Sequence, residues 1–361
     1  MTISNIKFHF IIIGQGLAGS LLAWRLIEQG KKVLVIDACL QQTTSRSAAG
    51  LINPVTGKRL VKPDNIANYL AEAKKLYTDL SFSFGEKFLF EKQQLKLFQT
   101  EDDVLQWQKR RKDEAYAAYL GEQFQGIEKS FLKAGSLGGF EQKQCSYLDT
   151  VSLLDKLRCF LLEKDSFVKA ELNLNDLKIR SDSVEWKGYQ AEKAVFCDGY
   201  HLQNNPWFSW LPLQPVQGEI ITLETDQTLP EEIIQFGKWL LPLTKNQFKL
   251  GATWQWQPLD EMATEKSFNE LTKACYAEFP QLKGAKVIEK KVGIRPATKD
   301  KNPFIGQHPE LPQLMVFNGF GSKGSLLIPW YSECFAQYLL KGEALPNNVD
   351  IKRYKNVYTA R

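Results

Sequence analysis

The sequence predicts an α/β fold in which a parallel, helix-covered sheet comes first and an antiparallel sheet belongs to a second domain. Two observations support this fold class. Within residues 8–37 an apolar strand, a glycine-rich loop, an amphipathic helix and a second apolar strand follow one another. Later in the chain, residues 213–225 and 236–256 alternate between apolar and polar side chains, as half-buried antiparallel strands do.

The first strand and the loop after it have a definite pattern. Residues 8–13 read FHFIII, which suits a strand buried on both faces. Residues 14–19 read GQGLAG, and leucines then recur at helical spacing as far as Gly30, where a helix stop belongs. The next strand covers residues 32–36 and ends at Asp37. This order is that of a Rossmann-like βαβ unit.

Each glycine of the loop has a physical task. Gly14 permits a tight turn, Gly16 lets the backbone approach a pyrophosphate, and Gly19 lets the helix lie against the strand. Asp37 lies about 20 residues further on, where a carboxylate accepts ribose hydroxyl groups. The absence of an Arg directly after it disfavours the 2′-phosphate of NADP. The predicted dinucleotide contacts are Gly14, Gly16, Leu17, Ala18, Gly19, Asp37 and Ala38.

Composition excludes several other classes. The net charge of +5 is weak evidence for a polyanionic partner, and no apolar run is long enough to span a bilayer. Six scattered cysteines without a C-x-x-C pair, and only three histidines, predict no metal site. With no signal-peptide pattern, we expect reduced thiols and a cytoplasmic protein.

Four further segments carry a family resemblance: residues 45–50 (SRSAAG), 194–199 (AVFCDG), 292–306 (VGIRPATKDKNPFIG) and 318–324 (NGFGSKG). Together with the N-terminal loop they resemble the D-amino-acid oxidase superfamily of flavoenzymes, which includes glycine oxidase and sarcosine oxidase. The resemblance implies FAD as cofactor and hydride transfer from the carbon beside an amine nitrogen. It also implies FAD contacts at Arg46, Ser47, Ala48, Ala49, Gly50, Cys197, Asp198, Gly199, Gly319, Phe320, Gly321, Ser322, Lys323 and Gly324.

The family's FAD domain is discontinuous, so its pieces are expected near 1–80, 145–208 and 290–361. An α+β substrate domain with an antiparallel sheet would then use 81–144 and 209–289. The late glycine loop opens a helix expected over 325–340, whose N-terminal dipole would stabilise negative charge on a reduced flavin. Pro329 is expected near the first turn of that helix, where a missing N–H is tolerated.

Three residues are candidates for direct catalytic roles. In the family motif, Arg295 grips a substrate carboxylate through a planar fork, although it could instead form a structural ion pair with Asp300. Lys323 would place a cation near flavin or substrate. Glycine oxidase has a carboxylate-binding Arg at the position of Ser322, so simple glycine oxidase activity is in doubt. Trp254 would wall the substrate pocket or pack between strands.

Several alternatives stay open. The flavin domain of the bacterial enzyme that modifies tRNA wobble uridine has loops like 297–300 (ATKD) and 321–324 (GSKG), and the basic run 109–112 could contact phosphates. Acidic residues flank that run, so a solvated helix face and no nucleic-acid partner are expected. A 2-hydroxy-acid dehydrogenase and a flavoprotein subunit of a complex are further readings. The electron acceptor is oxygen or unknown.

The segment 53–59 (NPVTGKR) resembles a phosphate-binding loop only loosely. Its glycine spacing differs, and Arg59 stands where Ser or Thr would coordinate magnesium. An ATPase is therefore not expected, and the segment is expected to lie over the flavin.

Overall fold

The computed structural model describes residues 7–129, 131–260 and 262–358, and the chain divides into two units. The first consists of Met1–Arg46, Thr150–Val216 and Ile294–Arg361, and the second of Ser47–Asp149 and Gln217–Gly293. Both are discontinuous. Residues 47–80 group with the second unit, whereas the sequence placed them in the first. Pairing of β3 (Leu51–Ile52) with β8 (Ser146–Leu148) is a long-range contact that local patterns do not reveal.

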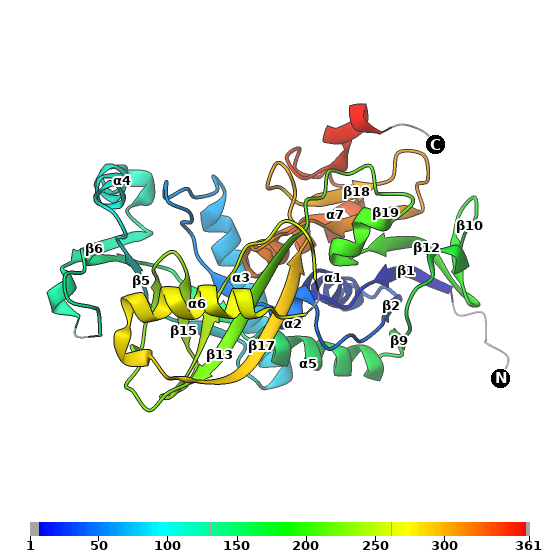
Figure 1. The fold of residues 1–361 in the computed structure, drawn as a ribbon. Helices are drawn as coiled ribbons and strands as arrows, with labels where there is room; N and C mark the ends of the chain where they lie inside the picture. Colours follow the sequence, from blue (N-terminus) through cyan, green and yellow to red (C-terminus); the bar gives the residue numbers. More distant parts are fainter. Residues whose placement is uncertain (1–6, 130, 261, 359–361) are drawn as a thin grey trace. The chain divides into compact units, whose positions relative to one another are not determined.

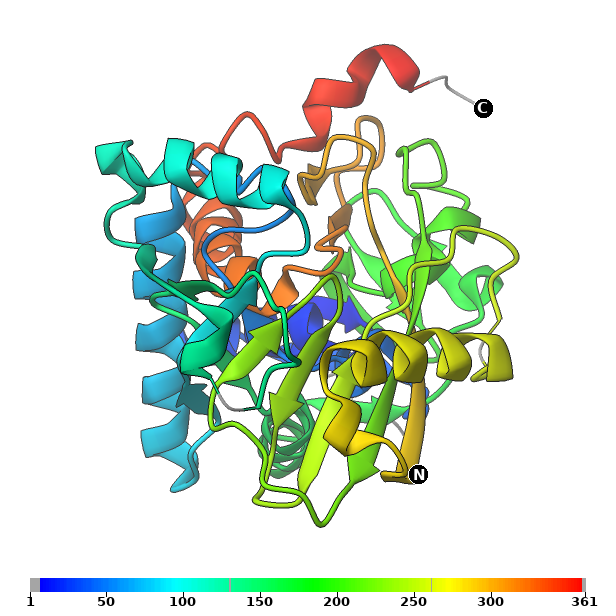
Figure 2. The same ribbon diagram turned by 60° about the vertical axis from the view of Figure 1, so that its left-hand side comes forward.

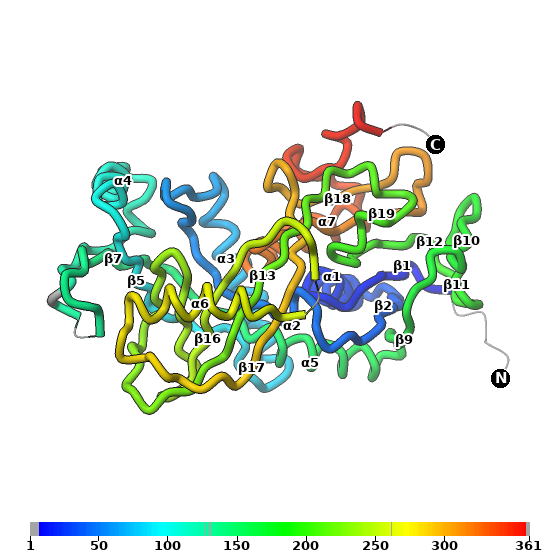
Figure 3. Tube along the Cα trace, in the orientation of Figure 1, coloured from blue at the N-terminus to red at the C-terminus, as the bar shows by residue number. Residues whose placement is uncertain are grey.

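The first unit contains an eight-stranded sheet in which β1 pairs in parallel with β2 and β12, β2 with β9, and β12 with β19 (Figure 1). Antiparallel neighbours are β18 beside β19 and the pair β10 and β11 beside the start of β12 (Figure 3). The strands are β1 (Lys7–Ile13), β2 (Val33–Asp37), β9 (Phe167–Lys169), β10 (Leu177–Ile179), β11 (Val184–Trp186), β12 (Tyr189–Phe196), β18 (Phe304–Gln307) and β19 (Leu314–Asn318).

This parallel arrangement, with helices on the sheet, confirms the predicted Rossmann-like class. Helix α1 packs on α7 and on α5. The helices are α1 (Leu17–Glu28), α2 (Thr44–Ser47), α5 (Thr150–Glu163) and α7 (Gly324–Lys341), with 3₁₀ turns η3 (Leu174–Asp176), η4 (Gly199–Asn204) and η6 (Ile351–Val357).

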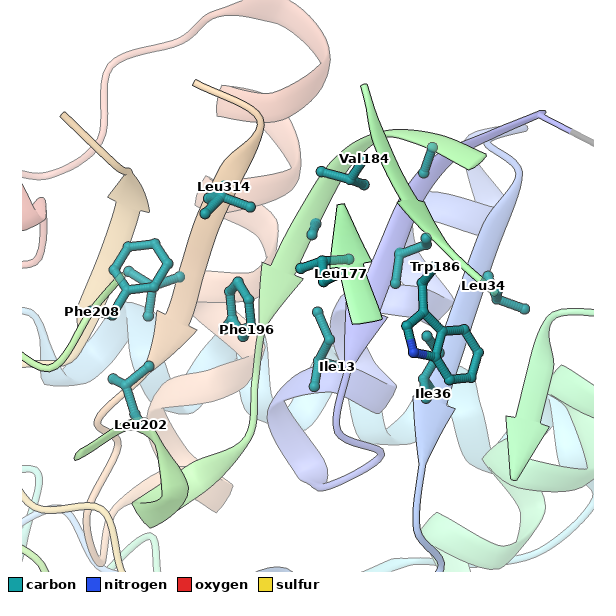
Figure 4. Close-up of a cluster of buried hydrophobic side chains, with 14 of the residues drawn as sticks. Ile13, Leu34, Ile36, Leu177, Val184, Trp186, Phe196, Leu202, Phe208 and Leu314 are labelled. Carbon is teal, nitrogen blue, oxygen red and sulfur yellow. The ribbon is translucent and has the colours of Figure 1, made fainter. Parts of the chain in front are cut away.

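The core under one face of this sheet explains why its strands are continuous apolar runs. Ile13, Leu34 and Phe196 point into a cluster that also contains the fully buried Trp186 and Phe208 (Figure 4). Because β1 and β2 are buried on both faces, they have no solvated side, and apolar and polar residues do not alternate along them.

The second unit is built on another eight-stranded sheet, in the order β17-β13-β16-β15-β14-β5-β7-β6, and a small sheet, β3-β8-β4. β5 pairs with β14 in parallel, whereas β13 with β16, β14 with β15, β15 with β16, β5 with β7 and β6 with β7 are antiparallel, as predicted for this sheet. The remaining strands are β4 (Leu89–Glu91), β5 (Gln94–Leu97), β6 (Leu120–Phe124), β7 (Gly139–Gln142), β13 (Val216–Glu224), β14 (Ile233–Gln235), β15 (Trp239–Pro242), β16 (Gln247–Gly251) and β17 (Lys286–Arg295).

Helix α6 covers one face of this sheet. In Figure 2 it crosses the yellow-green strands, and its buried Leu271 and Cys275 pack against Leu223 and Leu250. Thr264 caps its first turn by accepting the Ser267 N–H at 3.1 Å. The helices here are α3 (Ile66–Phe84), α4 (Glu101–Arg111) and α6 (Glu265–Glu278), with 3₁₀ turns η1 (Glu114–Tyr116), η2 (Gly126–Glu128) and η5 (Pro280–Leu282).

Pro329 corrects one expectation, because it lies inside α7 rather than in its first turn. A proline at this position leaves a carbonyl of the preceding turn without its helical donor and disturbs the ladder. Arg25 of α1 binds the turn that follows the proline: its guanidinium donates to the Pro329 carbonyl at 3.0 Å and to the Ser332 hydroxyl at 2.9 Å. It also forms an ion pair with Glu333. One side chain thus ties α1 to α7 at the proline.

We predict that Arg25→Met destabilises the protein by about 2 kcal/mol, because charged hydrogen bonds and the half-buried Glu333 lose their partner. Urea unfolding of the variant and wild type would measure the difference. Lys32→Met is the matched control, since Lys32 is exposed. Equal loss of stability in both variants would contradict the role of the α1–α7 clamp.

Candidate functional site

The glycine loop after β1 is held by contacts that no side chain could tolerate. Gly14 has φ 101°, and a Cβ there would lie 2.7 Å from the Cys197 carbonyl oxygen. A Cβ on Gly19 would lie 2.0 Å from the Gly14 oxygen. At Gly16 a Cβ would meet only the Ser45 hydroxyl, at 3.2 Å, so its backbone is open to a ligand. The backbone at Gly14 and the close helix–strand approach at Gly19 thus agree with the predicted turn and packing, whereas the approach of a pyrophosphate to Gly16 stays a prediction.

The N-terminus of α1 faces this loop, with Leu17 and Ala18 in its first turn. No side chain caps Gly16, and the Leu17 N–H donates to the Ser45 hydroxyl at 3.0 Å. The helix end supplies partial positive charge to a bound anion. Ser45 is the first residue of the segment 45–50 that resembles the family, but it was not among the predicted cofactor contacts. Only the tertiary structure shows that its hydroxyl lies at the N-terminus of α1.

Asp37 ends β2, as expected, and is oriented by backbone donors. The N–H of Gln15, in the glycine loop, donates to one carboxylate oxygen of Asp37 at 2.7 Å. The N–H of Cys39, which follows Ala38, donates to the other oxygen at 2.7 Å. Lone pairs remain for hydroxyl groups of a ribose. The buried Gln15 amide in turn accepts from Arg158 Nε at 2.8 Å and donates to the Leu154 carbonyl at 3.0 Å. Sequence reasoning missed both Gln15 and Arg158, because their pairing spans 143 residues.

The predicted segment 46–50 divides between the units. Arg46 pairs with Asp155 at 2.7 Å within the first unit. In the second, the Ser47 hydroxyl donates to the Val292 carbonyl at 2.6 Å, and a Cβ on Gly50 would lie 1.9 Å from the Leu148 oxygen. Ala48 and Ala49 lie between them. These contacts are structural, and the cofactor role of the segment stays a prediction.

Asn318 joins two of the predicted cofactor segments. Its Nδ2 donates to the Asp198 carboxylate and to the Gly199 carbonyl, both at 3.0 Å, and its Oδ1 accepts the Gly319 N–H at 2.7 Å. The turn after β12 and the start of the late glycine loop are therefore fixed to each other. Burial raises the pKa of Asp198 to about 7 and raises that of the Cys197 thiol.

The late glycine loop has a backbone that demands glycine. Gly319 and Gly321 have φ 83° and 55°, and a Cβ on Gly319 would lie 2.8 Å from Thr298 Cγ2. Phe320 between them is buried, whereas Ser322 is exposed. Gly324 begins α7, and the Lys323 carbonyl accepts the first helical N–H groups. The loop is thus a pre-formed helix N-terminus, as predicted.

Arg295 and Lys323 are brought onto adjacent segments. The Gly321 N–H donates to the Pro296 carbonyl at 3.1 Å, one residue after Arg295 at the end of β17. Burial lowers the pKa of Arg295 to about 10, so the guanidinium stays protonated at neutral pH. Burial, and then the nearby Lys301, lower the pKa of Lys323. The two half-buried cations thus belong to segments of the first unit that are joined by a backbone hydrogen bond.

The structural alternative for Arg295 was an ion pair with Asp300. In the structure Asp300 pairs with Arg353 at 2.8 Å, which lowers the pKa of Asp300 against the opposing effect of burial. Asp300, the partner that the sequence suggested for Arg295, therefore forms its ion pair with Arg353.

Trp254 belongs to the second unit, and its side chain is 53% exposed. Its ring contacts Trp256 edge to face, with centroids 6.0 Å apart. The two indoles thus pair with each other at the surface, and the alternative of packing between strands does not describe them. Among the described residues, no group of His, Cys, Asp and Glu side chains could hold a metal ion.

Comparison with known proteins decides the family. The family model described as "FAD dependent oxidoreductase" matches residues 9–338. The chain belongs to this family. Glycine oxidase of Bacillus subtilis is 23% identical over 348 residues, covering 90% of this chain and 91% of the relative. The crystal structure of glycine oxidase from Bacillus cereus has the same fold, with a TM-score of 0.82, 20% identity, and coverage of 94% of this chain and 96% of that one.

A second relative is longer than this FAD-dependent oxidoreductase. The tRNA 5-methylaminomethyl-2-thiouridine biosynthesis bifunctional protein MnmC of Acinetobacter baylyi is 24% identical over 359 residues. The match covers 96% of this chain but 55% of the relative.

The first unit of this FAD-dependent oxidoreductase fits its cofactor. Gly14 and Gly19 lie where an added Cβ would strike backbone atoms, and α1 begins at Leu17 directly after the glycine at its N-cap. Asp37 presents a carboxylate that the Gln15 N–H orients. These donors and acceptors match a pyrophosphate and a ribose. None of the helices in the described part of the chain has the length and apolar character needed to cross a membrane.

Asp198 gives this site a pH dependence. Because its pKa is raised in the folded state, the native protein holds a proton that the unfolded chain releases, so stability falls as pH rises from about 4 to about 7. We predict that Asp198→Asn, which keeps an acceptor for Asn318, removes this decline. Unfolding of both proteins between about pH 5 and about pH 8 measures it.

Glu163→Gln is the control for this experiment, since it removes an exposed charge of the same sign from the first unit. Parallel stability curves for Asp198→Asn and wild type across the same pH range would show that Asp198 ionises normally.

Proposed function

We propose that this FAD-dependent oxidoreductase oxidises the C–N bond of a small amino acid or secondary amine whose carboxylate is held by Arg295. The supporting observation is the half-buried guanidinium at the end of β17, linked through Pro296 to the glycine loop that opens α7. The name of the glycine oxidase relatives agrees with such a substrate.

Arg295 would act by position. A planar guanidinium binds a carboxylate through two parallel hydrogen bonds, which fixes the adjacent carbon in one orientation. FAD held along the Gly14–Gly19 loop and Asp37 would supply a two-electron acceptor for the hydride of that carbon, with oxygen or another acceptor as the final oxidant. Lys323 would hold negative charge of the substrate or favour a negative cofactor ring. Trp254 would contribute a wall of the substrate site.

The same chemistry suits a cytoplasmic enzyme acting on small molecules. The structure forms no disulfide among the described cysteines, in keeping with a reducing compartment. We propose this location on that ground.

A second candidate function is oxidation of an aminomethyl side chain on tRNA wobble uridine. The similarity to MnmC along 96% of the chain favours it, as do the loops at 297–300 and 321–324. A carboxymethylaminomethyl base also presents a carboxylate beside a secondary amine, so Arg295 would have the same role.

We predict that Arg295→Met lowers kcat/KM for an amino acid by about 10- to 100-fold, since a charged hydrogen bond contributes roughly 1.5–3 kcal/mol. Anaerobic flavin bleaching with an amino acid and with the amine lacking its carboxylate measures the effect. The loss should be confined to the substrate that has a carboxylate.

Lys341→Met, which removes an exposed cation from the end of α7, should retain wild-type kinetics. Equal losses of Arg295→Met on both substrates, with FAD content unchanged, would disprove carboxylate binding by Arg295.

A further inference from the structure

The segment 53–59, which resembles a phosphate loop only loosely, forms part of a tight hairpin in the second unit. Thr56 and Val61 exchange two backbone hydrogen bonds of 2.9 Å, and Lys58 and Arg59 occupy the exposed tip. The loop that carries this hairpin, drawn in blue, lies beside helix α4, drawn in cyan (Figures 1 and 2). The tip therefore presents two cations to solvent next to the last turn of α4.

Buried and strained groups hold the hairpin rigid. Leu60 is buried yet has φ 49°, a conformation that costs free energy in a residue other than glycine. Lys96 lies beneath the hairpin and donates to the Gly57 carbonyl at 2.7 Å. Burial lowers the pKa of this Lys96 ammonium to about 8. The burial of Leu60 and the hydrogen bond from Lys96 thus fix the backbone of the tip.

The basic end of α4 is fastened to the same hairpin. Arg110 Nε donates to the Arg59 carbonyl at 3.3 Å, and its guanidinium lies 5.0 Å from the Tyr116 ring centroid. Lys62 Nζ lies 5.4 Å from that same centroid. Two cations from segments far apart in sequence thus share one aromatic ring. Among the residues that the structure describes, Arg111 is the member of this run that has an acidic partner, Glu122 at 2.6 Å.

We define the basic surface as Lys58, Arg59, Lys62, Lys109 and Arg110. Within the part of the chain that the structure describes, none of these five forms an ion pair. The acids flanking α4 are used elsewhere: Asp103 caps the N-terminus of α4, and Asp113 accepts the Ala115 N–H at 3.0 Å. The sequence predicted a solvated helix face here, and the exposed Lys109 agrees with that prediction.

An ordinary structural reason covers part of this surface. Cations in the last turn of a helix are stabilised by its dipole, which accounts for Lys109 and Arg110. It does not account for Lys58 and Arg59, which lie on a separate hairpin held beside them. Gathering like charges costs free energy that a bound polyanion would return.

We propose that the basic surface binds the phosphodiester backbone of RNA. Two guanidinium groups on rigid supports suit phosphate oxygens, which they bind through paired hydrogen bonds. The proposal rests on the second candidate function, because the substrate there is an RNA. Backbone contacts of this kind position a nucleic acid without reading its bases.

The test measures binding without turnover, so its failure is separate from a failure of the proposed oxidation. Fluorescence anisotropy of a labelled RNA stem–loop with the FAD-loaded protein gives the affinity over a range of salt concentrations. Wild type should bind at low salt, with log affinity falling linearly with log salt. The double variant Lys58→Gln/Arg59→Gln should bind more weakly, and its salt slope should be smaller by about two, one for each lost phosphate contact.

Lys266→Gln/Lys273→Gln on α6 is the matched control, because it removes two exposed cations from the same unit. It should bind the RNA as wild type does, and thermal unfolding should show both double variants folded. Wild type that binds no RNA at low salt, or a tip variant with an unchanged salt slope, would overturn the proposal. Binding to phosphatidylglycerol vesicles but not to RNA would also overturn it and assign the surface to a membrane.

Discussion

The first unit depends on close backbone contact at the carboxyl ends of its parallel strands. Gly14 meets the carbonyl of Cys197, and Gly19 meets the carbonyl of Gly14, at separations where any Cβ would overlap. Strand β1, helix α1 and the end of β12 can approach only because these positions have no side chain. The open backbone at Gly16 and the orientation of Asp37 by the Gln15 N–H follow from that approach.

Side-chain clamps extend this constraint over long sequence separations. Asn318 connects the turn after β12 with the late glycine loop, and Arg25 connects α1 with α7 at Pro329. Both use buried polar groups, which cost free energy unless every donor and acceptor is satisfied. A few buried hydrogen bonds therefore fix the positions of the cofactor segments. Such preorganisation is expected of a site whose groups must be in place before the ligand binds.

Charge in the molecule is arranged in two ways. Asp300 with Arg353, and Arg46 with Asp155, are compensated pairs that stabilise local structure. Arg295 and Lys323 lie on segments that adjoin at a glycine loop, and the basic surface gathers like charges at a strained hairpin. Clusters of like charge on rigid backbone are a common property of sites that bind anions.

Local sequence was enough to predict the βαβ unit, the glycine turn after β1 and the place of Asp37 at the end of β2, because each depends on spacing within about one strand and one helix. It was also enough to predict the antiparallel sheet and α6 from their periodicities. Family resemblance added FAD and the late glycine loop. Tertiary structure alone decided the position of Pro329 within α7, the membership of residues 47–80, the partner of Asp300, and the roles of Gln15, Ser45, Arg158 and Asn318. These depend on pairings between distant segments, whose closure is set by the packing of the whole core and leaves no periodic signal in the sequence.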